Sequence, residues 1–174
     1  MTARRLALLA AAAILAGNAQ VAADPAPTLT VHFSPHGGCS QAVVAFIGEA
    51  KQTIRLSAYG FTSAPIADAL VAARKRGVDV RAVLDRSDAG PKAGKNSKAT
   101  AVKSGGVLVW IDAKHPIMHD KFVVVDGVSV ETGSYNYTSQ GENNAQNCLV
   151  VRDAGLAQAY AANWAEHQAH SAAL

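Results

Sequence analysis

Residues 119–138 read HDKFVVVDGVSVETGSYNYT, and this stretch decides how the chain folds. Two apolar runs flank Asp126-Gly127, a dipeptide typical of a tight β-hairpin turn. Polar residues gather at the open end of this hairpin: His119, Lys121, Ser134 and Asn136. Because a hairpin returns the chain to its starting level, we expect these four side chains to converge at one end of a sheet.

The four residue types together suggest a site for an oxyanion. Lys121 supplies positive charge and hydrogen-bond donors, and Ser134 and Asn136 supply directed donors. His119 can attack as a nucleophile or transfer protons near neutral pH. Taken singly, each group is more often structural, because lysines usually extend their charge to water and serine and asparagine often make turns. The case for catalysis therefore depends on their combination.

Outside the hairpin, strand patterns alternate with helix patterns. Strands are expected at 28–34, 53–61, 78–85, 107–111 and 146–153. Helices are expected after Ser40, over 63–77, in a short segment ending at Gly105-Gly106, and over 155–172. This alternation predicts an α/β fold with right-handed crossovers. We expect one domain with a mixed, largely parallel sheet sandwiched between helices.

The first residues have the pattern of a secretory signal peptide. Arg4 and Arg5 precede the apolar run LALLAAAAILAG, and small residues follow in NAQVAAD. The run is shorter than the roughly 20 residues that a membrane span needs, which disfavours an uncleaved anchor. We expect residues 1–23 to be removed and 24–174 to form the domain. The prediction is an exported bacterial protein, periplasmic or secreted, without stable membrane association after cleavage.

Overall charge says little about partners, since Arg4 and Arg5 supply two of the three excess positive charges. A local basic loop is more informative. Its candidate phosphate contacts are Lys92, Lys95 and Lys98, with a merely solvated loop as the alternative. Cys39 and Cys148 lack metal-ligand spacing, and either a disulfide or two buried thiols fits an exported protein.

The hairpin carries six residues at fixed spacing: His119-x-Lys121-x4-Asp126 and Gly133-Ser134-x-Asn136. This pattern resembles the HxKx4D…GSxN motif of the phospholipase D superfamily. The rest of the chain resembles its small exported nucleases, which have one motif per chain. The resemblance implies phosphodiester cleavage without a metal ion or cofactor, in two steps through a phosphohistidine. It also implies a symmetric homodimer in which His119 of each subunit faces one phosphorus atom.

Three further residues receive supporting roles from this resemblance. Asp126 would fix the hairpin and the nearby backbone, and Gly133 belongs to the motif. Gln146 stands where the family often has a glutamate that hydrogen-bonds the nucleophilic histidine. A carboxamide can still orient an imidazole, but it lacks the charge that stabilises the imidazole cation.

Several functions fit this pattern. The first is a non-specific endonuclease acting on DNA, and also on RNA, through phosphate contacts. Single strands would be favoured if Tyr59, Phe61 or Tyr135 stack on bases. The alternatives are a phospholipid hydrolase and a catalytically weak nucleic-acid-binding homologue. A metal phosphoesterase is disfavoured, because its candidate ligands lack a tight spacing: His32, His36, His115 and His119 with Asp112 or Asp120.

Overall fold

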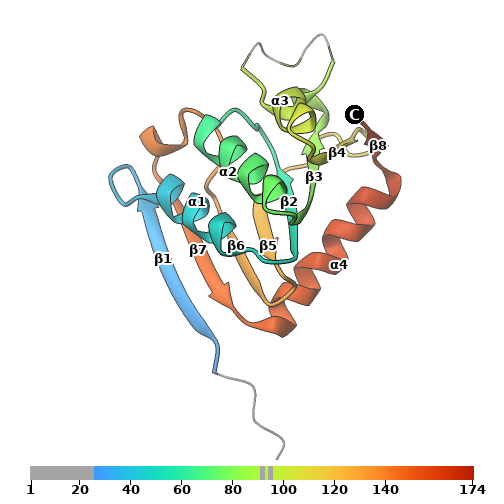
Figure 1. The fold of residues 1–174 in the computed structure, drawn as a ribbon. Coiled ribbons are helices and arrows are strands. Elements are labelled where there is room, and N and C mark those ends of the chain that lie inside the picture. Colours follow the sequence, from blue (N-terminus) through green and yellow to red (C-terminus); the bar gives the residue numbers. More distant parts are fainter. Residues whose placement is uncertain (1–25, 91–92, 94–95) are drawn as a thin grey trace, which may run out of the picture.

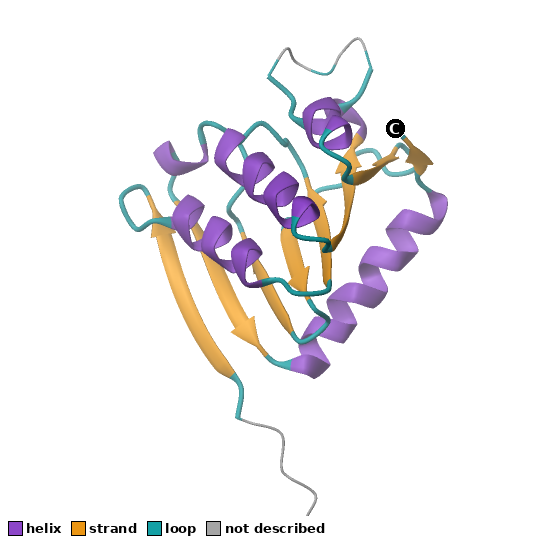
Figure 2. Cartoon of the chain, in the orientation of Figure 1, coloured by secondary structure: helices purple, strands orange, loops and turns teal. Residues whose placement is uncertain are grey.

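The computed structural model describes residues 26–90, 93 and 96–174, and within them one sheet has the strand order β1-β7-β6-β5-β2-β3-β4-β8. The strands are β1 (Thr28–Ser34), β2 (Thr53–Ala58), β3 (Asp79–Asp85), β4 (Leu108–Asp112), β5 (Phe122–Val125), β6 (Ser129–Gly133), β7 (Gln146–Arg152) and β8 (Ala172–Ala173). The α-helices are α1 (Cys39–Glu49), α2 (Ala64–Lys75), α3 (Ala99–Ser104) and α4 (Ala154–His170). Short 3-10 turns are η1 (Arg86–Asp88) and η2 (Gly141–Asn143). Figure 1 shows this arrangement, and Figure 2 separates its helices from its strands.

The sheet is mixed but mostly antiparallel, so the expectation of a largely parallel sheet is wrong. Only the β2–β3 and β3–β4 pairs are parallel, and the other pairs are antiparallel. The physical reason lies in the crossover from β1 through α1 to β2. Its two strands are not neighbours, because β5, β6 and β7 lie between them in the sheet. Those three strands follow one another antiparallel.

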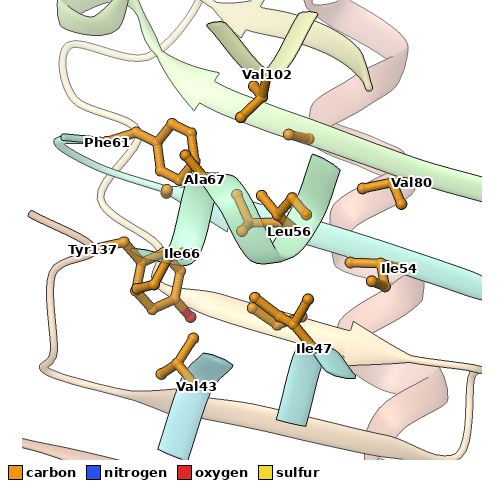
Figure 3. Packing of buried hydrophobic residues seen from close by; sticks show 14 of the residues in the cluster. Val43, Ile47, Ile54, Leu56, Phe61, Ile66, Ala67, Val80, Val102 and Tyr137 are labelled. Atoms are coloured by element: carbon orange, nitrogen blue, oxygen red, sulfur yellow. The ribbon is translucent and has the colours of Figure 1, made fainter. Parts of the chain in front are cut away.

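Helices cover both faces of the sheet, as the sequence predicted. Helices α1, α2 and α3 bury one face in the larger core, part of which Figure 3 shows. Helix α4 covers the other face, where Trp164 packs with Val83 and Phe122. The Trp164 indole also donates a hydrogen bond to the Leu56 carbonyl, at 2.9 Å. The single α/β domain is therefore confirmed.

Two further expectations concern the termini and the cysteines. The predicted signal peptide, residues 1–23, lies outside the described residues. Among the residues that are described, no helix is both long and apolar enough to cross a membrane. Cys39 and Cys148 are buried free thiols, and the Cys148 Sγ lies 3.9 Å from the Cys39 carbonyl oxygen.

Candidate active site

The four polar residues at the open end of the hairpin meet around one hollow. His119 and Lys121 lie in the loop just before β5, and Ser134 and Asn136 follow the end of β6. Pairing of Phe122 with Thr132 holds the two segments side by side. The hollow measures about 370 Å³, and its lining includes all four residues. The convergence that the hairpin pattern predicted is present in the structure.

His119 and Lys121 form a close pair. The Lys121 Nζ lies 2.8 Å from the His119 Nδ1 and donates to the His119 carbonyl oxygen at 2.6 Å. The His119 side chain is exposed, whereas Lys121 is only 7% exposed. Burial lowers the pKa of Lys121 below its usual value, and the charge of Asp120 opposes that shift. Because Nδ1 meets Lys121, the outer ring nitrogen Nε2 is left to meet a substrate.

Tyr59, the residue after β2, packs against this pair. Its ring centroid lies 4.7 Å from that of His119, and the Lys121 ammonium lies 5.5 Å from the Tyr59 ring. An aromatic face so placed stabilises the cation and limits rotation of the imidazole. Stacking on nucleic-acid bases remains a prediction only for Tyr59, because Phe61 and Tyr135 are buried in the core.

Ser134 is held by a neighbour on β7 that the sequence reasoning did not identify. Its hydroxyl donates to the Asn147 Oδ1 at 2.9 Å and accepts from the Asn147 backbone N–H at 3.0 Å. Gly133 allows this close approach, since a Cβ there would lie only 2.2 Å from the Asn147 carbonyl oxygen. The glycine of the motif is therefore required by strand contact and not by an unusual backbone angle.

Gln146 orients Asn136. Its Oε1 accepts from the Asn136 backbone N–H at 3.0 Å and from the Asn136 Nδ2 at 3.4 Å. Its own amide donates to the Gly141 carbonyl at 3.0 Å. The hydrogen bond to His119 expected by analogy is not formed within the described part of the chain. Gln146 thus supports the site through Asn136.

Asp126 lies at the turn of the hairpin and accepts hydrogen bonds from the nearby backbone. Its backbone adopts a φ of 53°, in the left-handed region that turns use. Its carboxylate accepts from the backbone N–H groups of Lys51, Gln52 and Thr53 at 2.8–2.9 Å. Burial opposes ionisation of this carboxyl, but the three donors outweigh it and lower its pKa. Asp126 therefore fixes the hairpin to the start of β2, away from the hollow.

A buried carboxylate positions the loop before the motif. Asp85, 2% exposed at the end of β3, accepts from the Met118 backbone N–H at 2.8 Å. This bond fixes the backbone one residue before His119. No pattern in the sequence distinguished Asp85, because a strand-terminal aspartate usually makes a local turn.

Of the predicted phosphate contacts, only Lys98 falls within the described residues, and it does not line this hollow. Lys98 lines a separate one with Thr62 and Glu142, and Lys92 and Lys95 lie outside the described residues. Of the disfavoured set of metal ligands, only Asp112 and His115 meet within the described residues, at 2.8 Å. His32 lies on β1, whereas His119 pairs with Lys121.

Comparisons with known proteins agree with this geometry. Residues 43–167 match the family model described as "Cardiolipin synthase, PLD-like domain". A phospholipase D of Rickettsia prowazekii is 36% identical over 143 residues, which cover 82% of this chain and 68% of the relative. The mitochondrial cardiolipin hydrolase of Xenopus laevis is 35% identical over 122 residues, or 70% of this chain and 56% of that protein.

Among solved structures, Nuc from Salmonella typhimurium, a phospholipase D family member, has a TM-score of 0.79 and 37% identity. The similarity covers 85% of this chain and 98% of Nuc. NucT from Helicobacter pylori has the same fold at 19% identity, with a TM-score of 0.76 over 85% of this chain and 99% of that one. With the motif geometry and these relatives together, the chain belongs to the phospholipase D superfamily and is a phosphodiesterase enzyme of that superfamily.

Proposed function

We propose that the protein is a non-specific endonuclease that hydrolyses DNA, and also RNA, through a phosphohistidine in a homodimeric active site. The observation that carries this proposal is the His119–Lys121 pair, which opens onto the same hollow as Ser134 and Asn136. These groups supply a nucleophile, a cation and neutral donors around one point. Phosphoryl transfer needs little more than such positioning and charge stabilisation.

The first step is attack of the His119 Nε2 lone pair on phosphorus, which forms a P–N bond and breaks the bond to the leaving oxygen. For this the ring proton must be on Nδ1, where Lys121 now donates. Phosphoryl oxygens are stronger acceptors than a neutral imidazole nitrogen. Substrate therefore draws the ammonium onto the phosphate and frees Nδ1 to hold the proton.

Both steps need a second acid–base group: in the first it protonates the leaving oxygen, and in the second it activates water. Among the residues that line the hollow, His119 is the only histidine. In a C2 dimer the partner's His119 lies opposite, protonates the leaving oxygen and then takes a proton from water. That water attacks phosphorus, the P–N bond breaks, and both histidines return to their starting states. The exposure of His119 supports a site that a second subunit completes.

A polymeric substrate is supported by a second hollow next to the first. It measures about 740 Å³, and its lining includes Tyr59, Arg86 and Ile117. Tyr59 also contacts His119, so the two hollows share a wall. A nucleic-acid strand could place one phosphate at His119 and its neighbour near Arg86. Contacts of this kind recognise the backbone and not the bases.

A phospholipid hydrolase is the second candidate. The observation that favours it is that relatives of this chain include a phospholipase D and a mitochondrial cardiolipin hydrolase. The same histidine chemistry would act on a head-group phosphodiester.

We also propose that the protein is exported to the periplasm or the medium, which the apolar run after Arg5 supports.

Two assays run side by side separate these activities. The wild type, His119→Asn and a control, His36→Asn, are incubated in EDTA with supercoiled plasmid and with vesicles of phosphatidylcholine or cardiolipin. His36 is exposed and has a φ of 69°, which asparagine tolerates. We expect plasmid nicking by the wild type and the control but not by His119→Asn. Release of lipid head groups without plasmid nicking would establish the phospholipid hydrolase. Binding of plasmid without cleavage of either substrate would indicate a nucleic-acid-binding homologue.

A further inference from the structure

Four side chains of metal-binding type that do not line the catalytic hollow gather where the end of β4 meets the last turns of α4. They are Asp112, His115, His167 and His170. One ligand atom from each lies within 4.8 Å of every other. The Asp112 side chain is fully buried, and those of His167 and His170 are 17% and 23% exposed. Such convergence of one carboxylate and three imidazoles calls for a physical explanation.

The distances are close to those of a tetrahedral metal site. The Asp112 Oδ2 lies 2.8 Å from the His115 Nδ1, and 3.1 Å from both the His167 Nδ1 and the His170 Nε2. Zinc binds imidazole nitrogen and carboxylate oxygen at about 2.0–2.2 Å, which makes the edge of its tetrahedron roughly 3.3 Å long. The three distances from the Asp112 Oδ2 lie within about half an ångström of that edge, and the four ligand atoms lie within 4.8 Å of one another, so the imidazoles would have to close round the ion by small side-chain rotations.

Hydrogen bonding alone accounts poorly for this cluster. Three ring nitrogens point at one carboxylate oxygen, which has two lone pairs. The other oxygen, Oδ1, already accepts from the backbone N–H groups of Lys114 and His115. A single cation at the centre would give each of the three nitrogens and Oδ2 a partner.

Local structure on both sides favours a built site. Asp112 and His115 are three residues apart, and so are His167 and His170, which therefore lie on one face of α4. Trp164 anchors that part of the helix to the sheet. The free nitrogen of His167, Nε2, lies 3.5 Å from the Asp120 carboxylate. A carboxylate behind a ligand histidine is the usual outer contact of zinc sites.

We propose that Asp112, His115, His167 and His170 bind one zinc ion with a structural role. Three nitrogens and one oxygen are a ligand set that zinc accepts, and four protein ligands leave no open position for substrate. The ion ties the end of α4 to the segment that leads into the motif, since Asp120 lies between His119 and Lys121. This proposal revises the expectation that the chain has no metal site.

The first test measures the metal itself. The protein is purified through a tag without histidine, stripped with EDTA, and titrated with Zn²⁺ against a chromophoric chelator and separately with Co²⁺. We expect one ion per chain, bound more tightly than about 1 μM, and the intense visible bands of tetrahedral Co²⁺. Zinc at about 100 times its Kd should raise Tm by roughly 5–10 °C. Absence of saturable binding would mean that the cluster is only a hydrogen-bonded one.

Matched variants locate the ion. His170→Ala and His167→Ala should each weaken zinc binding by at least about 100-fold. His36→Asn and His119→Asn should bind as the wild type does. Loss of binding in His119→Asn, but not in His170→Ala, would place the ion in the catalytic hollow and overturn the proposal. If the α4 variants do not fold, the Co²⁺ spectrum and Tm shift of the wild type decide the question. Stripped protein kept below its lowered Tm should still nick plasmid, because the zinc touches no reacting group.

Discussion

Two contacts to His119 hold the Lys121 ammonium at the candidate active site. In the free protein its ammonium meets the His119 Nδ1 and carbonyl oxygen, and burial lowers its pKa. A partly desolvated cation is a strong partner for a developing negative charge, because water competes with it less. The charge is thus held at the site before substrate arrives.

Replacing Lys121 with methionine should remove this charge while filling a similar volume. We expect cleavage to fall by about 10²–10³-fold or more, the usual cost of one oxyanion donor, with the fold intact. Plasmid nicking rates and a thermal melt check this, with Lys75→Met on the exposed side of α2 as the control. A Lys121→Met protein that cleaves within a factor of three of the wild type would show that the ammonium is not part of the machinery.

Gly133 should tolerate no side chain. Alanine there would bring a Cβ to 2.2 Å from the Asn147 carbonyl oxygen and separate β6 from β7 beside Ser134. We expect Gly133→Ala to cost ~1–3 kcal/mol of unfolding free energy, measured by urea denaturation, and to slow cleavage as well. Gly48→Ala in α1 is the matched control, since nothing lies within 4 Å and alanine favours a helix. Equal stability of the two variants would refute this account.

Strand β6 holds a buried carboxyl whose protonation should contribute to the free energy of unfolding near neutral pH. Glu131 is 1% exposed and accepts a hydrogen bond from the Tyr137 hydroxyl. Burial raises its pKa from 4.5 to about 8, a shift that the Tyr137 bond only partly offsets. The folded protein therefore keeps this proton in a range where the unfolded chain has lost it.

The consequence is a loss of stability as pH rises. Between pH 4.5 and about 8 the unfolded state binds fewer protons, so the free energy of unfolding falls by up to about 1.4 kcal/mol per pH unit. Glu131→Gln should remove this contribution, and its stability relative to the wild type should be greater near pH 8 than near pH 5. Urea denaturation of both proteins across this range checks the prediction. If the free energies of unfolding of both proteins change with pH in the same way, Glu131 is not protonated in the folded state over this range.

At the scale of elements, the sequence predicted where the strands and helices lie, except for the short β8 at Ala172–Ala173, where a helix end was expected. It did not predict how all the strands pair. The hairpin pattern implied antiparallel pairing of β5, Phe122–Val125, although its continuous apolar run is also typical of strands in parallel sheets. In the structure Val123 and Val125 face one core and Phe122 and Val124 the other, because helices cover both faces. Continuous apolar residues report burial on both faces and not strand direction. The pairing of β5 with β2 depends on long-range contacts that no local pattern encodes.

At the scale of the whole molecule, the sequence predicted the candidate active site but not the proposed zinc site. The residues of the candidate active site lie within one hairpin and just beyond its ends, so their spacing alone predicted that they converge. Asp112 and His167 are 55 residues apart and meet only because α4 packs across the sheet. Their pairs at three-residue spacing were visible in the sequence, but each pair alone is common on solvated surfaces. Sequence reasoning therefore finds sites that are local and misses those that packing assembles.

The proposed sharing of one active site by two subunits makes a quantitative prediction for mixed dimers. If one phosphorus atom needs His119 from both subunits, a dimer of one wild-type and one His119→Asn chain has no working site. Random exchange of equal amounts should then leave about one quarter of the wild-type activity per total dimer, whereas independent sites would leave about one half. Native mass spectrometry confirms that subunits have exchanged, and wild type mixed with His36→Asn controls for dilution. A linear fall with the wild-type fraction would mean that each chain acts alone, and the acid and base would then have to come from within one subunit.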